Sequence, residues 1–262
     1  MVASRDVPAL FRELTGWAAA TGWAPMTHAY GDHPEQTADL LLPAGAGPHR
    51  VAVLLHGGFW RTRFTQALMA ALGADLAARG WATWNVEYRR AGSDGGVPET
   101  IDDVRAAIRA VPQLGAPLDT SAVVIVGHSA GGQLGLCVAD EPLVGAVVSL
   151  AGVCDLRAAA RERIGEDAAR QFVGATPAQR PDAYALADPL SRLPAGIPLL
   201  LAHGDADARV PVAHSRRYAR AACRAGDRCE LVELRGVDHF ELIDPRTSAW
   251  TAVADRIPAL LA

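Results

Sequence analysis

Lysine is absent from this 262-residue sequence, and all 25 of its cationic side chains are arginine. This absence excludes Schiff-base chemistry, which needs a lysine amine. We attribute the absence of lysine, together with the large number of alanines, to coding bias. The formal net charge is −4 and no basic stripe occurs, so we do not expect nucleic acid as a partner.

Cysteine is scarce, and no C-x-x-C pair occurs among Cys137, Cys154, Cys223 and Cys229. The spacing excludes a zinc ribbon and a dithiol redox site, so neither a metal nor a cofactor is expected. Cys137 and Cys154 lie in apolar stretches and are expected to be reduced core residues. Whether Cys223 and Cys229 pair is left open.

Long hydrophobic runs are also missing, so no segment is expected to span a bilayer. The first six residues are polar and lack the apolar core of a signal peptide. We therefore expect a cytoplasmic protein without membrane attachment, with residues 1–262 forming a single domain. The oligomeric state stays open, with a homodimer as one alternative.

Strand and helix signals alternate along the chain after a predicted N-terminal helix and an irregular segment within residues 1–36, which contains Trp17 and Trp23. Apolar runs predict strands at residues 40–42, 51–55, 82–88, 123–126, 144–150, 197–202 and 230–234. Helical periodicity predicts helices at residues 64–79, 100–111, 212–223 and 249–260, and Thr100–Asp103 resembles a capping box. This alternation predicts an α/β fold with a mostly parallel central sheet and helices on both faces.

Residues 155–190 break the alternation and are rich in arginine and proline. They predict either a small helical insertion over the functional site or a pair of ordinary surface helices. We keep both alternatives open, because loops commonly carry insertions.

The most informative motif is a Gly-x-Ser-x-Gly directly after the predicted strand at residues 123–126. It reads Gly127-His128-Ser129-Ala130-Gly131. A serine between a strand and a helix in this pattern is typical of a nucleophile elbow, a tight turn that presents the hydroxyl in a cleft. Ser129 is therefore the predicted nucleophile of a serine hydrolase.

A serine nucleophile needs a base and an acid, which follow it along the chain in this kind of fold. His239 follows the last predicted strand and is the predicted base. His203 is expected to stabilise its loop, and His214 is expected at the surface of a helix. For the acid, Asp207 is favoured over Asp205 by motif spacing, and Asp205 is then expected to shape the loop.

The oxyanion of acyl transfer needs hydrogen-bond donors. The loop His56-Gly57-Gly58-Phe59-Trp60 follows the predicted strand at residues 51–55. Its glycines leave backbone N–H groups open, so Gly58 and Phe59 are predicted donors, with Ala130 as the third. We expect His56 to brace this loop by hydrogen bonding.

Together these motifs resemble the α/β-hydrolase superfamily and, within it, the arylformamidase (kynurenine formamidase) and carboxylesterase group. The matching stretches are residues 56–60, 86–89, 127–132, 151–156, 203–211 and 238–240. The resemblance implies hydrolysis of an ester or of an aryl formamide without a cofactor. It also places Asp207 as the acid. The chain departs from the group at Cys154, where an aromatic residue is common.

We therefore predict a serine esterase for a small or aromatic ester, with a small-molecule ester or amide as its partner. Arylformamidase activity on N-formylkynurenine is the first alternative, and a non-catalytic ligand-binding protein is the remote one. The predicted substrate-binding residues are Trp60, Tyr88, Leu156 and Phe240, with core packing as the alternative role for several of them. An arginine, either Arg61 or one within residues 157–180, is a candidate for holding a substrate carboxylate.

Overall fold

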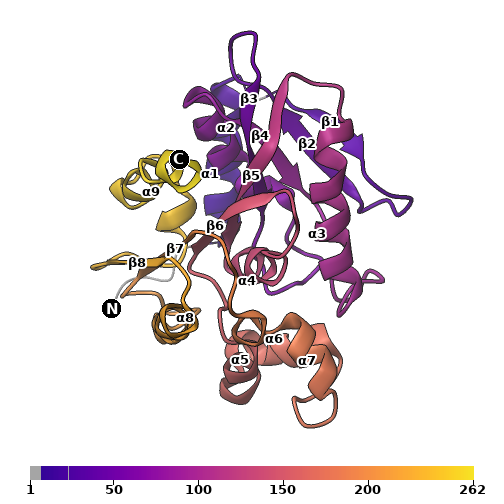
Figure 1. Ribbon diagram of the computed structural model, residues 1–262, viewed down its shortest axis with the longest axis vertical. Helices are drawn as coiled ribbons and strands as arrows, with labels where there is room; N and C mark the ends of the chain where they lie inside the picture. The colour runs from indigo at the N-terminus through magenta and orange to yellow at the C-terminus, as the bar shows by residue number, and fades with distance from the viewer. Residues whose placement is uncertain (1–6, 23) are drawn as a thin grey trace.

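The computed structural model describes residues 7–22 and 24–262 (Figure 1). The expectations about the first six residues and about Trp23 fall outside this part of the chain. Eight strands form one sheet in the order β1-β2-β4-β3-β5-β6-β7-β8, and only the pairs β1–β2 and β2–β4 are antiparallel. The strands are β1 Met26–Ala29, β2 Thr37–Leu41, β3 His49–Leu55, β4 Ala82–Val86, β5 Leu118–His128, β6 Val144–Leu150, β7 Leu199–Gly204 and β8 Cys229–Leu234.

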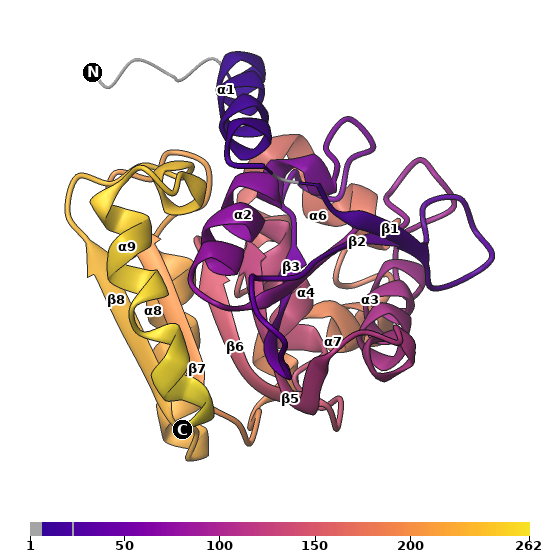
Figure 2. The same cartoon turned by 90° about the horizontal axis from the view of Figure 1, so that it is seen from above.

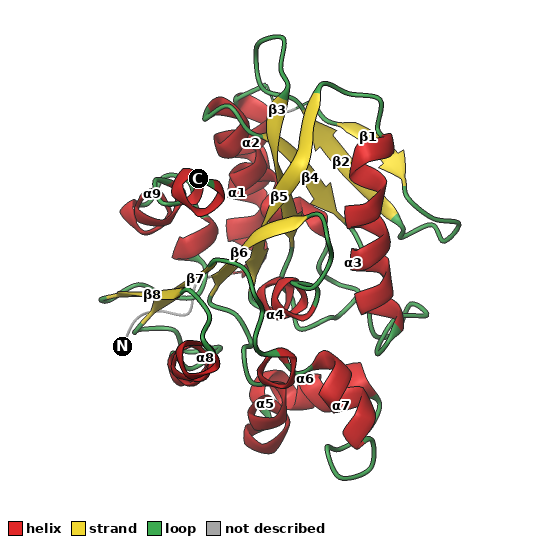
Figure 3. Ribbon diagram, in the orientation of Figure 1, coloured by secondary structure: helices red, strands yellow, loops and turns green. Residues whose placement is uncertain are grey.

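Helices cover both faces of the sheet (Figures 2 and 3). The helices are α1 Val7–Ala20, α2 Ala70–Ala78, α3 Glu99–Ala110, α4 Ala130–Cys137, α5 Leu156–Glu162, α6 Ile164–Val173, α7 Pro181–Ala187, α8 Ala213–Ala225 and α9 Ser248–Ala254. This arrangement confirms the predicted α/β fold. Within the described residues, no helix has the length and apolar character that crossing a bilayer requires.

The central strands are apolar throughout because both of their faces are buried. Alternate residues of a strand point to opposite faces, so Val53 and Ile125 enter one core while Leu54 and Val124 enter the other. The first core packs under α3, α4 and α8, and the second under α1, α2 and α9.

Two sequence predictions about local structure were wrong, and one strand was missed. The helix expected at residues 64–79 is shorter, because a 3-10 turn, Gln66–Met69, precedes α2. The helix expected at residues 249–260 ends at Ala254, and a separate 3-10 segment contains Pro258, which lacks the N–H that a continuing helix needs. The edge strand β1 was missed because three of its four residues are exposed, which removes the alternating pattern.

The predicted capping box at Thr100–Asp103 is also wrong. Helix α3 begins earlier, with Pro98 at the cap and no side-chain cap hydrogen bond. Thr100 Oγ1 instead donates to the carbonyl of Arg89, and Asp103 forms an ion pair with the same arginine at 2.7 Å. Both side chains therefore fix the segment after β4 rather than the helix start.

The segment 155–190 is a helical insertion, α5 to α7, followed by a 3-10 turn, Pro189–Arg192. The three helices lie together beside α4, below the sheet in the view of Figure 1. A Cβ added at Gly165 would lie 2.7 Å from the ring of Phe59, so the insertion packs directly on the glycine-rich loop after β3. The structure thus shows a helical insertion, whereas its position over the functional site stays a prediction.

Candidate active site

Ser129 occupies a strained turn between β5 and α4. Its φ of 55° and ψ of −113° lie outside the regions that a serine normally adopts, and its residue is 2% exposed. The flanking glycines are required by contact. A Cβ at Gly127 would lie 2.2 Å from the carbonyl oxygen of Gly131, and one at Gly131 would lie 2.1 Å from that of Leu55. The predicted elbow geometry is therefore present at Ser129.

Asp207 and His239 form a short, buried contact, with 2.6 Å between Asp207 Oδ2 and His239 Nδ1. Asp207 Oδ1 accepts the backbone N–H groups of Arg209 and Val210 at 2.8 and 2.9 Å, which fixes the carboxylate plane. Burial alone would raise the pKa of Asp207, but hydrogen bonds from His203 and His239 outweigh it and lower the pKa far below its usual range. Asp207 is therefore an anion that can orient the imidazole and stabilise its protonated form.

The competing acid, Asp205, is exposed and lies outside this contact. Its Oδ1 accepts the backbone N–H of Gly236 at 2.6 Å, which ties the loop after β7 to the loop after β8. This is the loop-shaping role that the sequence predicted for Asp205.

Of the two other late histidines, one behaves as expected. His203 is buried, with Nδ1 2.8 Å from Ser215 Oγ and Nε2 2.8 Å from the Val210 carbonyl, so it holds the acid loop closed. His214 was wrongly predicted at the surface. It is fully buried in α8, and its Nε2 lies 3.3 Å from Glu162 of the insertion.

Ser129 and His239 line the same small cavity, whose volume is about 20 Å³, roughly the space of one water molecule. The cavity is bounded by Gly58, Phe59, Phe64, Leu68, His128, Ser129, Arg209, His239 and Phe240. Ser129, the predicted base His239 and the predicted oxyanion loop thus lie together at the carboxyl ends of the strands, where ligands bind in parallel sheets.

The predicted oxyanion donors come from two elements. Gly58 and Phe59 have φ of +117° and 54°, which turns the loop after β3 toward the serine, and Ala130 is the first residue of α4. Among the hydrogen bonds between described residues, none is donated by the backbone N–H of these three residues. The first N–H groups of a helix lack partners within it, so such a site suits an anion. The role of these N–H groups as oxyanion donors stays a prediction.

A buried network braces the oxyanion loop. His56 Nδ1 lies 2.7 Å from the Gly57 carbonyl and Nε2 lies 3.0 Å from Glu87 Oε1. Tyr88 stacks on the imidazole at 4.3 Å and donates its hydroxyl to the His56 carbonyl at 2.6 Å. Burial would raise the pKa of Glu87, but the charge and hydrogen bond of His56 outweigh it and lower the pKa, which favours the carboxylate form of Glu87. His56 thus has the bracing position that the sequence predicted.

Three of the four predicted substrate-binding side chains lie in the core. Trp60 stacks on Phe172 at 4.5 Å, Tyr88 packs on His56, and Leu156 is fully buried. None of the three is among the residues that line the cavity, so core packing describes them and the substrate-binding prediction is corrected. Phe240 does line the cavity.

Sequence reasoning missed four residues that line the cavity, which are His128, Phe64, Leu68 and Arg209. His128, the variable residue before the serine, has its Nε2 3.0 Å from the His239 carbonyl oxygen, so it holds the base in place. Burial lowers the pKa of His128 well below its usual value, and the charge of His239 adds to this, so the ring is neutral. Phe64 lines the cavity from the segment before α2. The elbow motif gave the position of His128 but not its hydrogen-bond partner, which lies 111 residues away.

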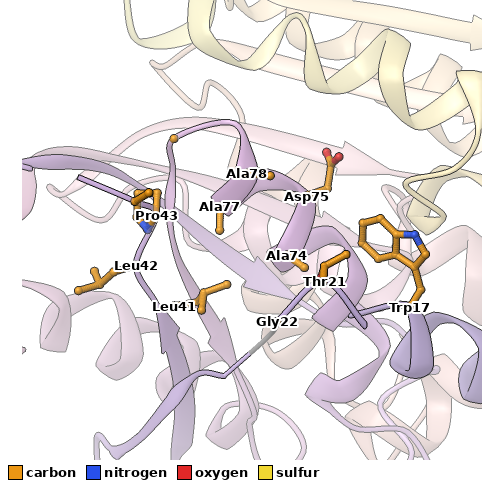
Figure 4. A pocket seen from close by; sticks show the side chains of 12 residues that line it. Trp17, Thr21, Gly22, Leu41, Leu42, Pro43, Ala74, Asp75, Ala77 and Ala78 are labelled. Atoms are coloured by element: carbon orange, nitrogen blue, oxygen red, sulfur yellow. The ribbon is translucent and has the colours of Figure 1, made fainter. Parts of the chain in front are cut away.

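A larger cavity of about 470 Å³ lies elsewhere, between α1, the segment after β2 and α2 (Figure 4). Its lining includes Trp17, Pro43 and Ala74 and none of the predicted site residues. Its carboxylate, Asp75, is already bound by Arg79 and by the indole of Trp250. Among the residues that the structure describes, no group of three histidine, cysteine, aspartate or glutamate side chains is arranged to hold a metal ion.

Comparison with known proteins agrees with this geometry. The model of the prolyl oligopeptidase family matches residues 60–257. The chain is 30% identical over 256 residues to the esterase LipC of Mycobacterium tuberculosis, covering 86% of this chain and 62% of LipC. It spans about three fifths of the length of the curated relatives that it matches.

Solved structures share the fold. A truncated carbohydrate esterase from gut microbiota gives a TM-score of 0.78 at 21% identity, covering 91% of this chain and 96% of the other. A thermophilic esterase from Thermogutta terrifontis gives 0.72 at 23% identity, covering 90% and 91%. The sheet order and these likenesses confirm the predicted α/β-hydrolase fold. The arylformamidase resemblance stays a prediction.

Proposed function

The chain belongs to the prolyl oligopeptidase family, and from this membership and the geometry at Ser129 we propose that it is a serine hydrolase that cleaves a carboxylic ester of a small or aromatic substrate. One observation carries the proposal. The buried Asp207–His239 contact of 2.6 Å ends at the same cavity that the strained Ser129 lines. Nucleophile, base and orienting acid in this order are the requirements of acyl transfer.

In the proposed mechanism, His239 takes the proton of Ser129 as the hydroxyl attacks the ester carbonyl. The backbone N–H groups of Gly58, Phe59 and Ala130 stabilise the tetrahedral oxyanion. His239 then protonates the leaving alcohol, and a water activated by His239 hydrolyses the acyl-enzyme. Asp207 holds the imidazole tautomer and stabilises the imidazolium throughout.

The relatives support ester hydrolysis, since two curated proteins that match the chain are named an esterase, LipC, and a methylesterase of isoprenylcysteine. Hydrolysis of an aryl formamide is the second candidate. The observation that favours it is the small cavity at Ser129, because formyl is the smallest acyl group. Comparing turnover of N-formylkynurenine with that of p-nitrophenyl acetate decides between the two.

Ser129→Ala tests the mechanism. We expect kcat/KM for p-nitrophenyl acetate to fall by at least about 10³-fold, because the nucleophile is removed while the packing of the elbow is kept. Initial rates give the activity, and circular dichroism checks the fold.

The matched control is Ser191→Ala, which truncates an exposed serine in the 3-10 turn after α7 and should keep full activity. Turnover retained in Ser129→Ala would contradict the proposed function.

A further inference from the structure

Two arginines stand on the aromatic walls of the cavity at Ser129. The guanidinium carbon of Arg209 lies 4.9 Å from the ring centroid of Phe240, and that of Arg63 lies 5.0 Å from the ring centroid of Phe64. Both rings line the cavity, and Arg209 lines it as well. The two cations come from different elements, the loop after β7 and the segment before α2. Arg209 lines the cavity itself, whereas Arg63 contacts the ring of Phe64, which lines it.

Both guanidinium groups are available to a ligand. Arg63 and Arg209 are exposed, and in the described part of the chain neither side chain forms an ion pair or a hydrogen bond within the protein. The predicted carboxylate-binding residue Arg61 differs. It is bound to the insertion, with Nη1 3.1 Å from Glu166 Oε2 and Nη2 2.7 Å from the Gly165 carbonyl.

The carboxylates around the site already have ionic or hydrogen-bond partners within the protein. Asp207 is bound by His203 and His239, and Glu87 by His56. Asp238, next to the base, accepts the backbone N–H groups of Phe240 and Glu241 at 2.8 and 3.0 Å. The two arginines are therefore not neutralised by the acid or by the loop-bracing carboxylate.

We infer that Arg209 and Arg63 bind a carboxylate on the part of the substrate that extends beyond the cavity. The cavity at Ser129 is small, so most of an ester would extend past its walls, where Arg209 lies over Phe240 and Arg63 over Phe64. A guanidinium binds a carboxylate through two parallel hydrogen bonds, and the aromatic ring under it keeps its plane oriented. This inference rests on the proposed function and names its substrate class as small-acyl esters with an anionic leaving group.

A pair of substrates tests the inference. In 4-acetoxybenzoate and its methyl ester the acetyl group and the aryl ring are the same, and only the first carries a charge. We expect the wild-type enzyme to prefer the anion in kcat/KM, after correction for the uncatalysed rates. Arg209→Gln should reduce this preference by about fivefold to tenfold, Arg63→Gln by less, and the double variant by the most.

The matched control is Arg224→Gln, which removes an exposed arginine at the end of α8 and should leave the preference unchanged within about twofold, as expected for an arginine that binds no ligand. Raising the salt concentration from about 50 mM to about 500 mM should weaken the preference of the wild type but not that of the double variant. A preference that is the same in the wild type and the double variant would overturn the inference.

Binding separates this inference from the proposed function. In a Ser129→Ala background, the Kd of 4-acetoxybenzoate and of its methyl ester can be measured by calorimetry without turnover. Tighter binding of the anion that is lost with Arg209→Gln supports the inference even if neither ester is hydrolysed. Equal binding of the two compounds overturns it even if the protein proves to be an esterase.

Discussion

At the scale of single residues, two aspartates two positions apart have opposite environments. Asp207 is buried against two histidines, whereas Asp205 is exposed and holds only a backbone N–H. Only the first can stabilise an imidazolium, because a partner in water is screened and one in the protein interior is not.

Asp207→Asn should therefore lower kcat for p-nitrophenyl acetate by about 10³–10⁴-fold. The asparagine amide would donate toward His239 Nδ1 and favour the tautomer that cannot take the serine proton at Nε2. Initial rates at pH 8 measure the effect.

Asp205→Asn is the matched control, and its kcat should stay within about threefold of the wild type, because an asparagine oxygen can still accept the N–H of Gly236. A larger loss in Asp205→Asn than in Asp207→Asn would reverse the assignment of the acid.

Motif spacing predicts Ser129, Asp207 and His239, because each follows a strand whose end the sequence marks, and the structure places Ser129 and His239 at one cavity with Asp207 against His239. Motif spacing could not predict whether a loop side chain points into the core or toward the cavity. Trp60 and Tyr88 adjoin the motifs yet point into the core, whereas Arg209 adjoins the same motifs and lines the cavity. That difference depends on packing across the sheet, which local sequence does not encode.

At the scale of elements, one carboxyl group joins the two ends of the helical insertion. Asp188, at its carboxyl end, accepts the backbone N–H of Leu156, at its start, at 2.9 Å. Asp188 is 2% exposed, and its Oδ2 lies 3.5 Å from Arg157 Nε. Burial raises the pKa of Asp188 from 3.8 to about 6, and the charge of Asp155 adds to this.

This raised pKa has a defined effect on stability. The native state keeps the proton of Asp188 between about pH 4 and pH 6, whereas the unfolded state releases it near its ordinary pKa of about 4. The native state therefore binds more protons in this window, so the contribution of Asp188 to stability is present at low pH and is lost as the pH rises toward 6.

Asp188→Asn removes this titration but keeps an oxygen to accept the Leu156 N–H. The free energy of unfolding of the variant, relative to the wild type, should increase by about 1–3 kcal/mol between pH 4 and pH 7. Urea unfolding at a series of pH values measures it.

Asp182→Asn, an exposed aspartate in α7, serves as the control and should show no such trend. A difference between Asp188→Asn and the wild type that does not change with pH would contradict the assignment.

The helical nature of the insertion follows from its sequence, but its position does not. Arg163, Glu166 and Asp167 have left-handed φ of 55° to 65°, which costs energy that the surrounding contacts must offset. The hydrogen bonds of Arg61 to Glu166 and to the Gly165 carbonyl offset part of this backbone strain. Because those partners are more than 100 residues apart, sequence periodicity could not predict the turn.

At the scale of the whole molecule, the order of strands and helices was predictable because the buried strands are short, continuous apolar runs. The same reasoning missed β1, whose residues are mostly exposed, and joined 3-10 segments to their neighbouring helices. Elements defined by a buried face are therefore predictable here, and elements defined by pairing or by a local change in helix type are not.

The second core is closed by α1 and α9, the elements from the two ends of the described chain. Trp250 of α9 is fully buried in the second core, and its Nε1 donates to Asp75 of α2 at 2.7 Å. Arg79 at the end of α2 binds both Asp75 and Asp255, so a hydrogen-bonded group joins α2 to α9.

Trp250→Ala should lower the free energy of unfolding by about 3–5 kcal/mol, because it leaves a large cavity and removes one partner of the half-buried Asp75 carboxylate. Trp250→Phe keeps most of the ring and should cost about 1–3 kcal/mol, mainly from the lost hydrogen bond. Urea unfolding followed by circular dichroism measures both, and a single cooperative transition is expected because α9 shares its core with β5 and β6. A loss below about 1 kcal/mol in Trp250→Ala, or a separate early transition, would mean that the C-terminal helix folds independently of the sheet and does not close its second core.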